Sequence, residues 1–306
     1  MRVRILGSAA GGGFPQWNCA CSNCRLIRQG TLRSVARTQV QVAVSQDGAS
    51  WFLLGASPDL PRQIESFPEL QPAAQSRGTQ IAALVLPGAD LDQILGLIML
   101  RESQPLRVYA TPPIRGIIMD NNIIFAMVRN QITWDDVAPN REFELASVTG
   151  AKSGIRCLPF PLSGNYPHYV HPQLAASLPP ADAVLGLRLE SANGNLLVYI
   201  PGAPSVEEPW LAHLERADLL LFDGTFWTDD ELIRIQGGGR TARQMGHMPV
   251  SGAEGSLARL AHLKRPRKVY IHVNNTNPIL DEASPEYRTV RDAGWEVAHD
   301  GMEFEL

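Results

Sequence analysis

The chain has 306 residues, 44% hydrophobic and 19% charged, a composition typical of a folded protein with a large buried core. Its 27 Lys and Arg against 31 Asp and Glu give a net charge of −4, which argues against nucleic-acid binding because phosphate contacts need a concentrated basic face. Four cysteines are too few for a secreted disulfide framework, so we expect a reducing, cytoplasmic compartment.

The N-terminal segment ends in glycines rather than in the apolar stretch of a signal peptide. Residues 3–6 read as a strand, and the run at 11–13 reads as a glycine turn. No segment approaches the ~20 apolar residues that a membrane span needs. The longest apolar run, 94–100, lies between Asp92 and Arg101. We therefore expect no membrane-spanning segment.

Short apolar runs alternate with helical patterns along the chain. The predicted strands are 3–6, 39–45, 51–54, 81–86, 106–110, 154–158, 184–189, 196–200, 219–222, 268–272 and 295–298. The predicted helices are 60–66, 91–102, 114–129, 206–216, 252–263 and 285–293. This order favours two mixed sheets packed face to face with helices outside, in a single domain spanning 1–306. Residues 159–180, rich in Pro, His and Ser, are expected to form a long loop.

Three of the four cysteines form a C-x-C-x-x-C cluster directly after the glycine turn. Three thiolates this close can bind one soft cation, and Zn²⁺ is the usual occupant, so Cys19, Cys21 and Cys24 are predicted ligands of a structural zinc. The alternative, three incidental thiols, is less favoured by the spacing. Cys157 lies in an apolar strand and is expected to fill the core. The fourth zinc ligand is left open among Asn274, Asn275 and His272.

Carboxylates and a histidine also lie at or just past the ends of buried strands. Asp90 and Asp92 follow the strand that ends at 86, and taken alone they are most simply an N-cap and a first-turn charge for the next helix. Asp223 follows a buried strand and precedes a glycine, and His272 ends another strand. His247 precedes the helix predicted near 252. Carboxylate and imidazole together suit Zn, Fe or Mn.

Six segments spread over the whole chain carry a family resemblance: GSAAGGGFPQWNCACSNC at 7–24, ASPDL at 56–60, FDGTFWTDDE at 222–231, GRTARQMGHM at 239–248, IHVNNTNPILDE at 271–282 and DGMEFEL at 300–306. Together they resemble the metallo-β-lactamase superfamily and, within it, the PqqB family of pyrroloquinoline quinone (PQQ) biosynthesis. That resemblance implies an αββα sandwich of two mixed sheets with helices on the outer faces and a metal site at one edge of the sheets.

Laid on this chain, the first metal motif of the superfamily, His-x-His-x-Asp-His, falls on GADLDQ at 88–93. Only Asp92 matches, which argues against a dinuclear hydrolytic zinc centre. PqqB proteins usually have His where this chain has Gln93, and an amide binds metal more weakly than an imidazole. The departure puts occupancy of this metal site in question.

The resemblance also implies roles for individual residues. Asp90, Asp92 and His272 are the expected ligands of an active-site metal. Asp223 is expected as a further ligand or as a carboxylate behind the ligands, and His247 as an acid/base or substrate contact. These roles come from the resemblance, because spacing does not assign them.

For the reaction, the resemblance implies hydroxylation that uses Fe²⁺ and O₂, acting on the tyrosine ring of the Glu-Tyr unit derived from the peptide PqqA. One alternative is a soluble carrier of PQQ or its precursor towards the periplasm, which Gln93 favours. Another is a metal-dependent phosphodiesterase, which the cysteine cluster and GHM at 246–248 favour. The oligomeric state is open, a homodimer included.

Overall fold

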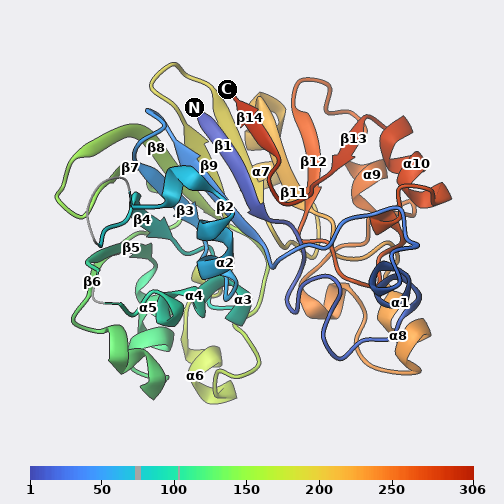
Figure 1. Ribbon diagram of the computed structural model, residues 1–306, viewed down its shortest axis with the longest axis horizontal. Coiled ribbons are helices and arrows are strands. Elements are labelled where there is room, and N and C mark those ends of the chain that lie inside the picture. The colour runs from blue at the N-terminus through green and yellow to red at the C-terminus, as the bar shows by residue number, and fades with distance from the viewer. Residues whose placement is uncertain (73–76, 103) are drawn as a thin grey trace. The chain divides into compact units, whose positions relative to one another are not determined.

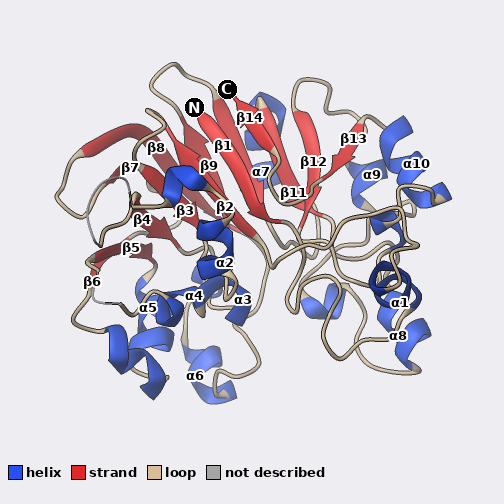
Figure 2. Ribbon diagram, in the orientation of Figure 1, coloured by secondary structure: helices blue, strands red, loops and turns tan. Residues whose placement is uncertain are grey.

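The computed structural model describes residues 1–72, 77–102 and 104–306, and its fold is shown in Figures 1 and 2. The chain divides into two compact units, each assembled from separate stretches of sequence. Unit 1 comprises Met1–Gly7, Gln41–Leu196 and Gly301–Leu306. Unit 2 comprises Ser8–Val40 and Leu197–Asp300. The single domain expected from the sequence stays a prediction, and each unit is described by itself.

Unit 1 holds a complete mixed sheet of seven strands in the order β14-β1-β2-β3-β4-β5-β6. The strands are β1 (Arg2–Gly7), β2 (Gln41–Ser45), β3 (Trp51–Leu54), β4 (Ile81–Val85), β5 (Leu106–Ala110), β6 (Ile132–Asp136) and β14 (Glu303–Glu305). Pairing is antiparallel from β14 to β3 and parallel from β3 to β6. Because β1 pairs with β14, the two chain ends lie side by side in Figure 1.

Helices of unit 1 pack on one face of this sheet. Leu60, Leu97 and Ile117, from three different helices, join Trp51 and Val108 of the strands in one buried apolar core. The helices are α2 (Leu60–Glu65), η1 (Pro68–Leu70), α3 (Leu91–Ile94), α4 (Gly96–Met99), α5 (Pro112–Met119) and η2 (Ile123–Val128). Unit 1 also contains β7 (Phe143–Ala146), β8 (Lys152–Pro161), α6 (Pro172–Ser177), η3 (Pro180–Asp182) and β9 (Leu185–Glu190).

Unit 2 is built on parallel strands, which pair β10 with β11, β11 with β12 and β12 with β13. They are β10 (Leu196–Ile200), β11 (Leu219–Asp223), β12 (Arg267–Ile271) and β13 (Trp295–Val297). The helices are α1 (Ser22–Arg28), α7 (Glu208–Arg216), α8 (Glu231–Gln236), η4 (Arg243–Met245), α9 (Ser256–Arg259), η5 (Pro278–Leu280) and α10 (Pro285–Asp292). Strands β7 to β13 make up the second mixed sheet. Two mixed seven-stranded sheets with helices confirm the predicted fold class.

The predicted helix 91–102 is wrong in its continuity. It is two short helices, α3 and α4, that meet at Gly96. The backbone N–H of Gly96 donates to the carbonyl of Ala56 at 2.8 Å rather than to the preceding helical turn. A Cβ at this glycine would lie 2.4 Å from the Ser57 carbonyl oxygen. Glycine therefore lets the chain approach the 55–57 turn closely, and the helix breaks there.

Other boundaries differ in the same way, because tertiary contacts decide them. The predicted helix 114–129 is α5 followed by η2, and of the predicted helix 252–263 only Ser256–Arg259 is α-helical. The predicted loop 159–180 contains the end of β8 and α6. The sequence did not predict β6, β7, β14, α1 or α8. Among the helices that the structure describes, none has the length and apolarity needed to cross a membrane.

Substituting Gly96 by Ala is expected to destabilise the protein by about 1–3 kcal/mol, because the new methyl group overlaps backbone atoms that cannot move aside. Urea unfolding followed by circular dichroism measures the change. Gly78→Ala is the control, since a Cβ there meets no atom within 4 Å. Equal midpoints for the two variants would contradict this account of the helix break.

Candidate metal centres

The register of β11 and β12 brings Asp223 and His272 together. Asp223, the last residue of β11, pairs with Ile271, the last residue of β12, so His272 is the next residue along. Parallel strands end at the same sheet edge, where ligand sites commonly form. A Cβ on Gly224 would lie 2.7 Å from Cβ of Tyr270, so glycine lets the chain turn away beside β12. The predicted strand-end placement is confirmed for these two residues.

The Asp223 carboxylate is fully buried, and both of its oxygens accept hydrogen bonds. Oδ1 accepts from the backbone N–H of Thr225 at 3.0 Å and from its hydroxyl at 2.6 Å. Oδ2 accepts from the backbone N–H of Ala203 at 3.1 Å and lies 2.9 Å from Nδ1 of His247. A buried carboxylate with this many partners is fixed in orientation.

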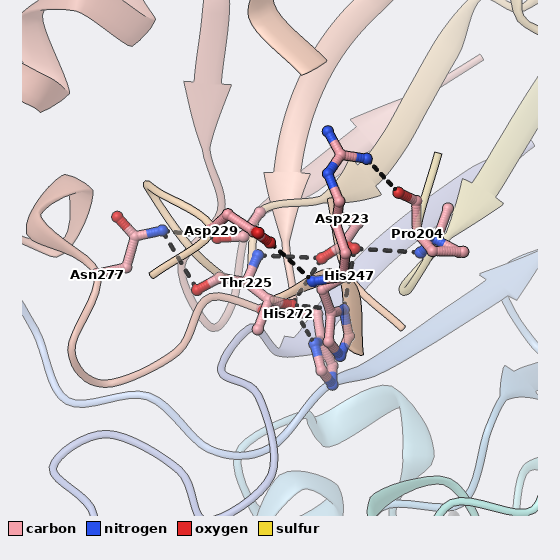
Figure 3. Close-up of polar contacts among 10 residues, drawn as sticks. Pro204, Asp223, Thr225, Asp229, His247, His272 and Asn277 are labelled. Carbon is pink, nitrogen blue, oxygen red and sulfur yellow. Dashed lines mark hydrogen bonds and ion pairs between the residues drawn. The ribbon is translucent and has the colours of Figure 1, made fainter. Parts of the chain in front are cut away.

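His247 and His272 lie side by side next to Asp223 and Thr225 (Figure 3). Their rings stack at a centroid distance of 5.1 Å and an interplanar angle of 21°. His247 follows a turn at Gly246 (φ +86°), and its ring fits against Gly202, where a Cβ would lie 3.1 Å from Cε1. With Asp223 they form one of two groups of metal-ligand side chains among the described residues.

The cysteine cluster is the other group. The Cys21 sulfur caps helix α1, accepting from the backbone N–H of Cys24 at 3.5 Å. The Asn275 side-chain nitrogen faces all three sulfurs, at 3.1 Å from Cys19, 3.6 Å from Cys21 and 3.3 Å from Cys24. Of the three candidates for a fourth ligand, Asn275 is therefore the one that the structure brings to the sulfurs. Turning its amide about would present oxygen, the atom that binds cations.

The chemistry of the cluster fits a cation. Burial raises the pKa of the Cys21 thiol to about 12, although the backbone N–H of Cys24 opposes the increase. Although burial opposes the decrease, hydrogen bonds from Cys21, Cys24 and Asn275 lower the pKa of Cys19. A cation such as Zn²⁺ among the three sulfurs would favour the thiolate form that binds metal. Cys157 lies fully buried in β8, which confirms it as a core residue.

The polar segment after β12 links the two groups within unit 2. The backbone N–H of Asn274 donates to the Thr225 carbonyl at 3.1 Å, and the Asn277 side chain donates to the Gly224 carbonyl at 2.9 Å. Between them, Asn275 reaches the cysteines. One cavity of about 600 Å³ is lined by residues of both groups, among them Cys19, Cys21, His247 and His272.

Asp90, Asp92 and Gln93 lie at the start of α3 in unit 1. Asp90 occupies the N-cap position, but its carboxylate makes no capping hydrogen bond, so the simple capping explanation does not account for it. Gln93 is buried, and its Oε1 has no hydrogen-bond partner. This oxygen occupies the space beside Gly55, where a Cβ would lie only 2.3 Å away. A buried amide oxygen without a partner is a ligand atom available to a cation.

Glu231 is a buried acid that the sequence reasoning missed. Its Oε1 accepts from the Thr276 hydroxyl at 2.5 Å, and its Oε2 accepts from the Trp227 backbone N–H at 2.6 Å. Burial raises the pKa of Glu231 from 4.5 to about 7, although the Thr276 hydrogen bond and the charge of Arg234 oppose the increase. Glu231 and Glu286 both line a cavity of about 350 Å³. Glu231 thus holds Thr276, which follows Asn274 and Asn275 in the segment after β12.

Comparison with known proteins places this chain among close relatives. Residues 50–273 match the family model described as beta-lactamase superfamily domain. Coenzyme PQQ synthesis protein B of Azotobacter vinelandii is 45% identical over 310 residues, and that of Methylorubrum extorquens is 41% identical over 306, with all of each chain covered. The crystal structure of Zn²⁺-bound PqqB from Methylobacterium extorquens matches over both full chains with a TM-score of 0.91 and 41% identity.

A diphosphatase of the PhnP family also matches, with a TM-score of 0.66 and 19% identity over 100% of this chain and 97% of that one. At this identity the likeness shows a shared fold. The fold implied by the sequence segments is therefore confirmed as metallo-β-lactamase-like, and the superfamily points to a metal-dependent enzyme.

Substituting Cys21 by Ser is expected to abolish tight zinc binding, because serine supplies no thiolate, while its hydroxyl still caps α1. Elemental analysis of purified protein measures the zinc. Cys157→Ala is the control and should retain about one zinc per chain. Zinc retained in full by the Cys21 variant would refute the assignment.

Between pH 4.5 and 7 the folded state keeps a proton on Glu231 that the unfolded state releases. The stability from this group is therefore complete below pH 4.5 and is lost as pH rises towards 7, by roughly 3 kcal/mol. Glu231→Gln should remove this loss. Urea midpoints of both proteins, measured from pH 5 to pH 8, should converge towards low pH and separate above it. Parallel curves would show that the site does not titrate in this way.

Proposed function

Because the chain belongs to the coenzyme PQQ synthesis protein B family, within the beta-lactamase superfamily, we propose that it is an Fe²⁺-dependent enzyme of PQQ synthesis that uses O₂ to hydroxylate the tyrosine ring of the PqqA-derived Glu-Tyr unit. The observation that carries the metal dependence is the hydrogen bond between Nδ1 of His272 and the Thr225 hydroxyl, at 2.8 Å. Metal-binding histidines commonly have the other ring nitrogen held in this way.

The family resemblance implies Asp90, Asp92 and His272 as iron ligands, and of these the structure brings His272 together with Asp223 and His247 in one group of metal-ligand side chains. When bound, Fe²⁺ supplies one-electron chemistry with O₂, which Zn²⁺ lacks. One oxygen atom of O₂ would enter the ring and the other would leave as water, with two electrons from an external reductant such as ascorbate. The ring carbon that gains oxygen must lose a proton, and His247 is the proposed base that accepts it. Asp223, whose oxygens are occupied by hydrogen bonds, orients His247 and stabilises its charge once it is protonated.

The proposed structural zinc is held by Cys19, Cys21 and Cys24, with Asn275 beside them. The Zn²⁺-bound relative supports a zinc site in this family. In this proposal the zinc keeps the segment that follows β12 in place and takes no part in the reaction. None of the four cysteines, all of which the structure describes, is in a disulfide, which is the basis for proposing a cytoplasmic enzyme.

Zinc-loaded protein is charged with Fe²⁺ without oxygen and then mixed with O₂, ascorbate as electron donor and a Glu-Tyr peptide. We expect a product heavier by one oxygen atom, detected by mass spectrometry. Gln93→His should bind Fe²⁺ about tenfold more tightly and form product faster, because imidazole replaces an amide. Asp92→Asn is the matched loss-of-ligand control. No product from either the natural chain or the Gln93 variant would refute the hydroxylase.

A soluble carrier of PQQ or its precursor is the second candidate, and the buried amide at Gln93 favours it because the metal site is weaker there. Calorimetric titration with PQQ separates the two. A carrier binds the quinone equally well with and without iron and consumes no oxygen. The hydroxylase consumes oxygen only when it carries iron.

A further inference from the structure

Thr225 is the centre of the polar network between the two histidines. Its buried hydroxyl oxygen lies 2.6 Å from Asp223 Oδ1, 2.8 Å from Nδ1 of His272 and 3.1 Å from Nδ1 of His247. The carbonyl oxygen of His272 is a fourth neighbour, at 2.9 Å. Nothing in the sequence pattern distinguishes this threonine from an ordinary turn residue after Asp223-Gly224.

The four contacts require a proton on Nδ1 of both histidines. A threonine hydroxyl has one proton to donate and two lone pairs that accept. Asp223 Oδ1 and the His272 carbonyl are oxygens that only accept, so the hydroxyl proton goes to them. The two histidine nitrogens must then bring protons of their own. Nδ1–H of His272 donates to the Thr225 hydroxyl, and Nδ1–H of His247 donates to Asp223 Oδ2 and to the same hydroxyl.

We propose that Thr225 is a positioning residue that fixes His272 in the Nδ1–H tautomer. In a neutral imidazole with its proton on Nδ1, the lone pair is on Nε2. His247 has the Asp223 carboxylate for the same purpose, so the proposal is made for His272, whose Nδ1 contacts the Thr225 hydroxyl. The tautomer follows from the contacts within unit 2 and does not depend on the metal or on the reaction.

One consequence rests on the proposed function. A nitrogen binds metal through its lone pair, so a ring held as Nδ1–H binds through Nε2 without first moving its proton. Without the hydroxyl, the ring also populates the Nε2–H form, which cannot bind a metal through that atom. Thr225 is therefore expected to affect metal affinity without touching the metal.

Histidine tautomers are read directly by NMR on protein labelled with ¹⁵N at histidine, at a pH about 1.5 units above the ordinary histidine pKa. The signals of His272 and His247 are assigned from His272→Gln and His247→Gln. In the natural chain His272 should show its proton on Nδ1. In Thr225→Val it should show the Nε2–H form or a mixture, and in Thr225→Ser, which keeps the hydroxyl, the natural pattern.

An Nε2–H signal for His272 in the natural chain, or an unchanged tautomer in a folded Thr225→Val, would overturn the inference. The backbone amide spectrum reports whether that variant is folded. If it is not, Thr225→Ala replaces it with the same expectation, because alanine also lacks the hydroxyl and is smaller.

Metal affinity is measured separately, by titrating zinc-loaded protein with Co²⁺ and following absorption. Thr225→Val should bind about 10- to 100-fold more weakly, and Thr225→Ser close to the natural chain. A changed tautomer in a protein that binds no second metal would keep the inference and remove the proposed iron site. If the tautomers are unchanged in Thr225→Val and the natural chain forms the hydroxylated product, the inference fails and the proposed function stands.

Discussion

The parallel pairing of β11 with β12 is the constraint on which the rest of the candidate site depends. Both strands are buried along nearly their whole length, so their hydrogen-bonded register cannot slip without exposing apolar side chains. In that register Asp223 pairs with Ile271, the residue before His272. The loops then add what the strands cannot supply, Thr225 from the turn after Gly224 and His247 from the turn at Gly246. The buried strands thus fix the Asp223 carboxylate, and that carboxylate orients the imidazole of His247.

Much of this arrangement is predictable from sequence, because apolar runs mark strands and polar residues at their ends mark a sheet edge. Asp223, His272 and the cysteine cluster stand out in that way. Thr225, Asn275 and Glu231 do not, since their roles arise from contacts between segments distant in sequence. Helices α1 and α8 are short, of 7 and 6 residues, and carry too little apolar periodicity to be recognised.

For a related reason, the strands at the edges of the first sheet were not predicted. Strands β6 and β14 are partly exposed, and their sequences lack the apolar runs of central strands. Gly96 shows the opposite case, where a strong helical pattern is divided because Ala56 accepts the hydrogen bond that would have continued it. In both cases neighbours in space, rather than neighbours in sequence, decide the local structure. The α/β class follows from the sequence, whereas element boundaries and the contacts inside the site require the structure.

The backbone of His272 has a consequence for anyone who wishes to redesign this site. Its φ of +58° lies in the left-handed region, which Asn and Asp enter far more readily than other residues and which β-branched side chains resist. Exchanging the imidazole for a carboxylate or an amide therefore keeps the chain path intact, whereas Val or Ile would strain it. At the proposed metal site such an exchange would replace a nitrogen donor by an oxygen donor, which would favour harder cations without rebuilding the sheet edge.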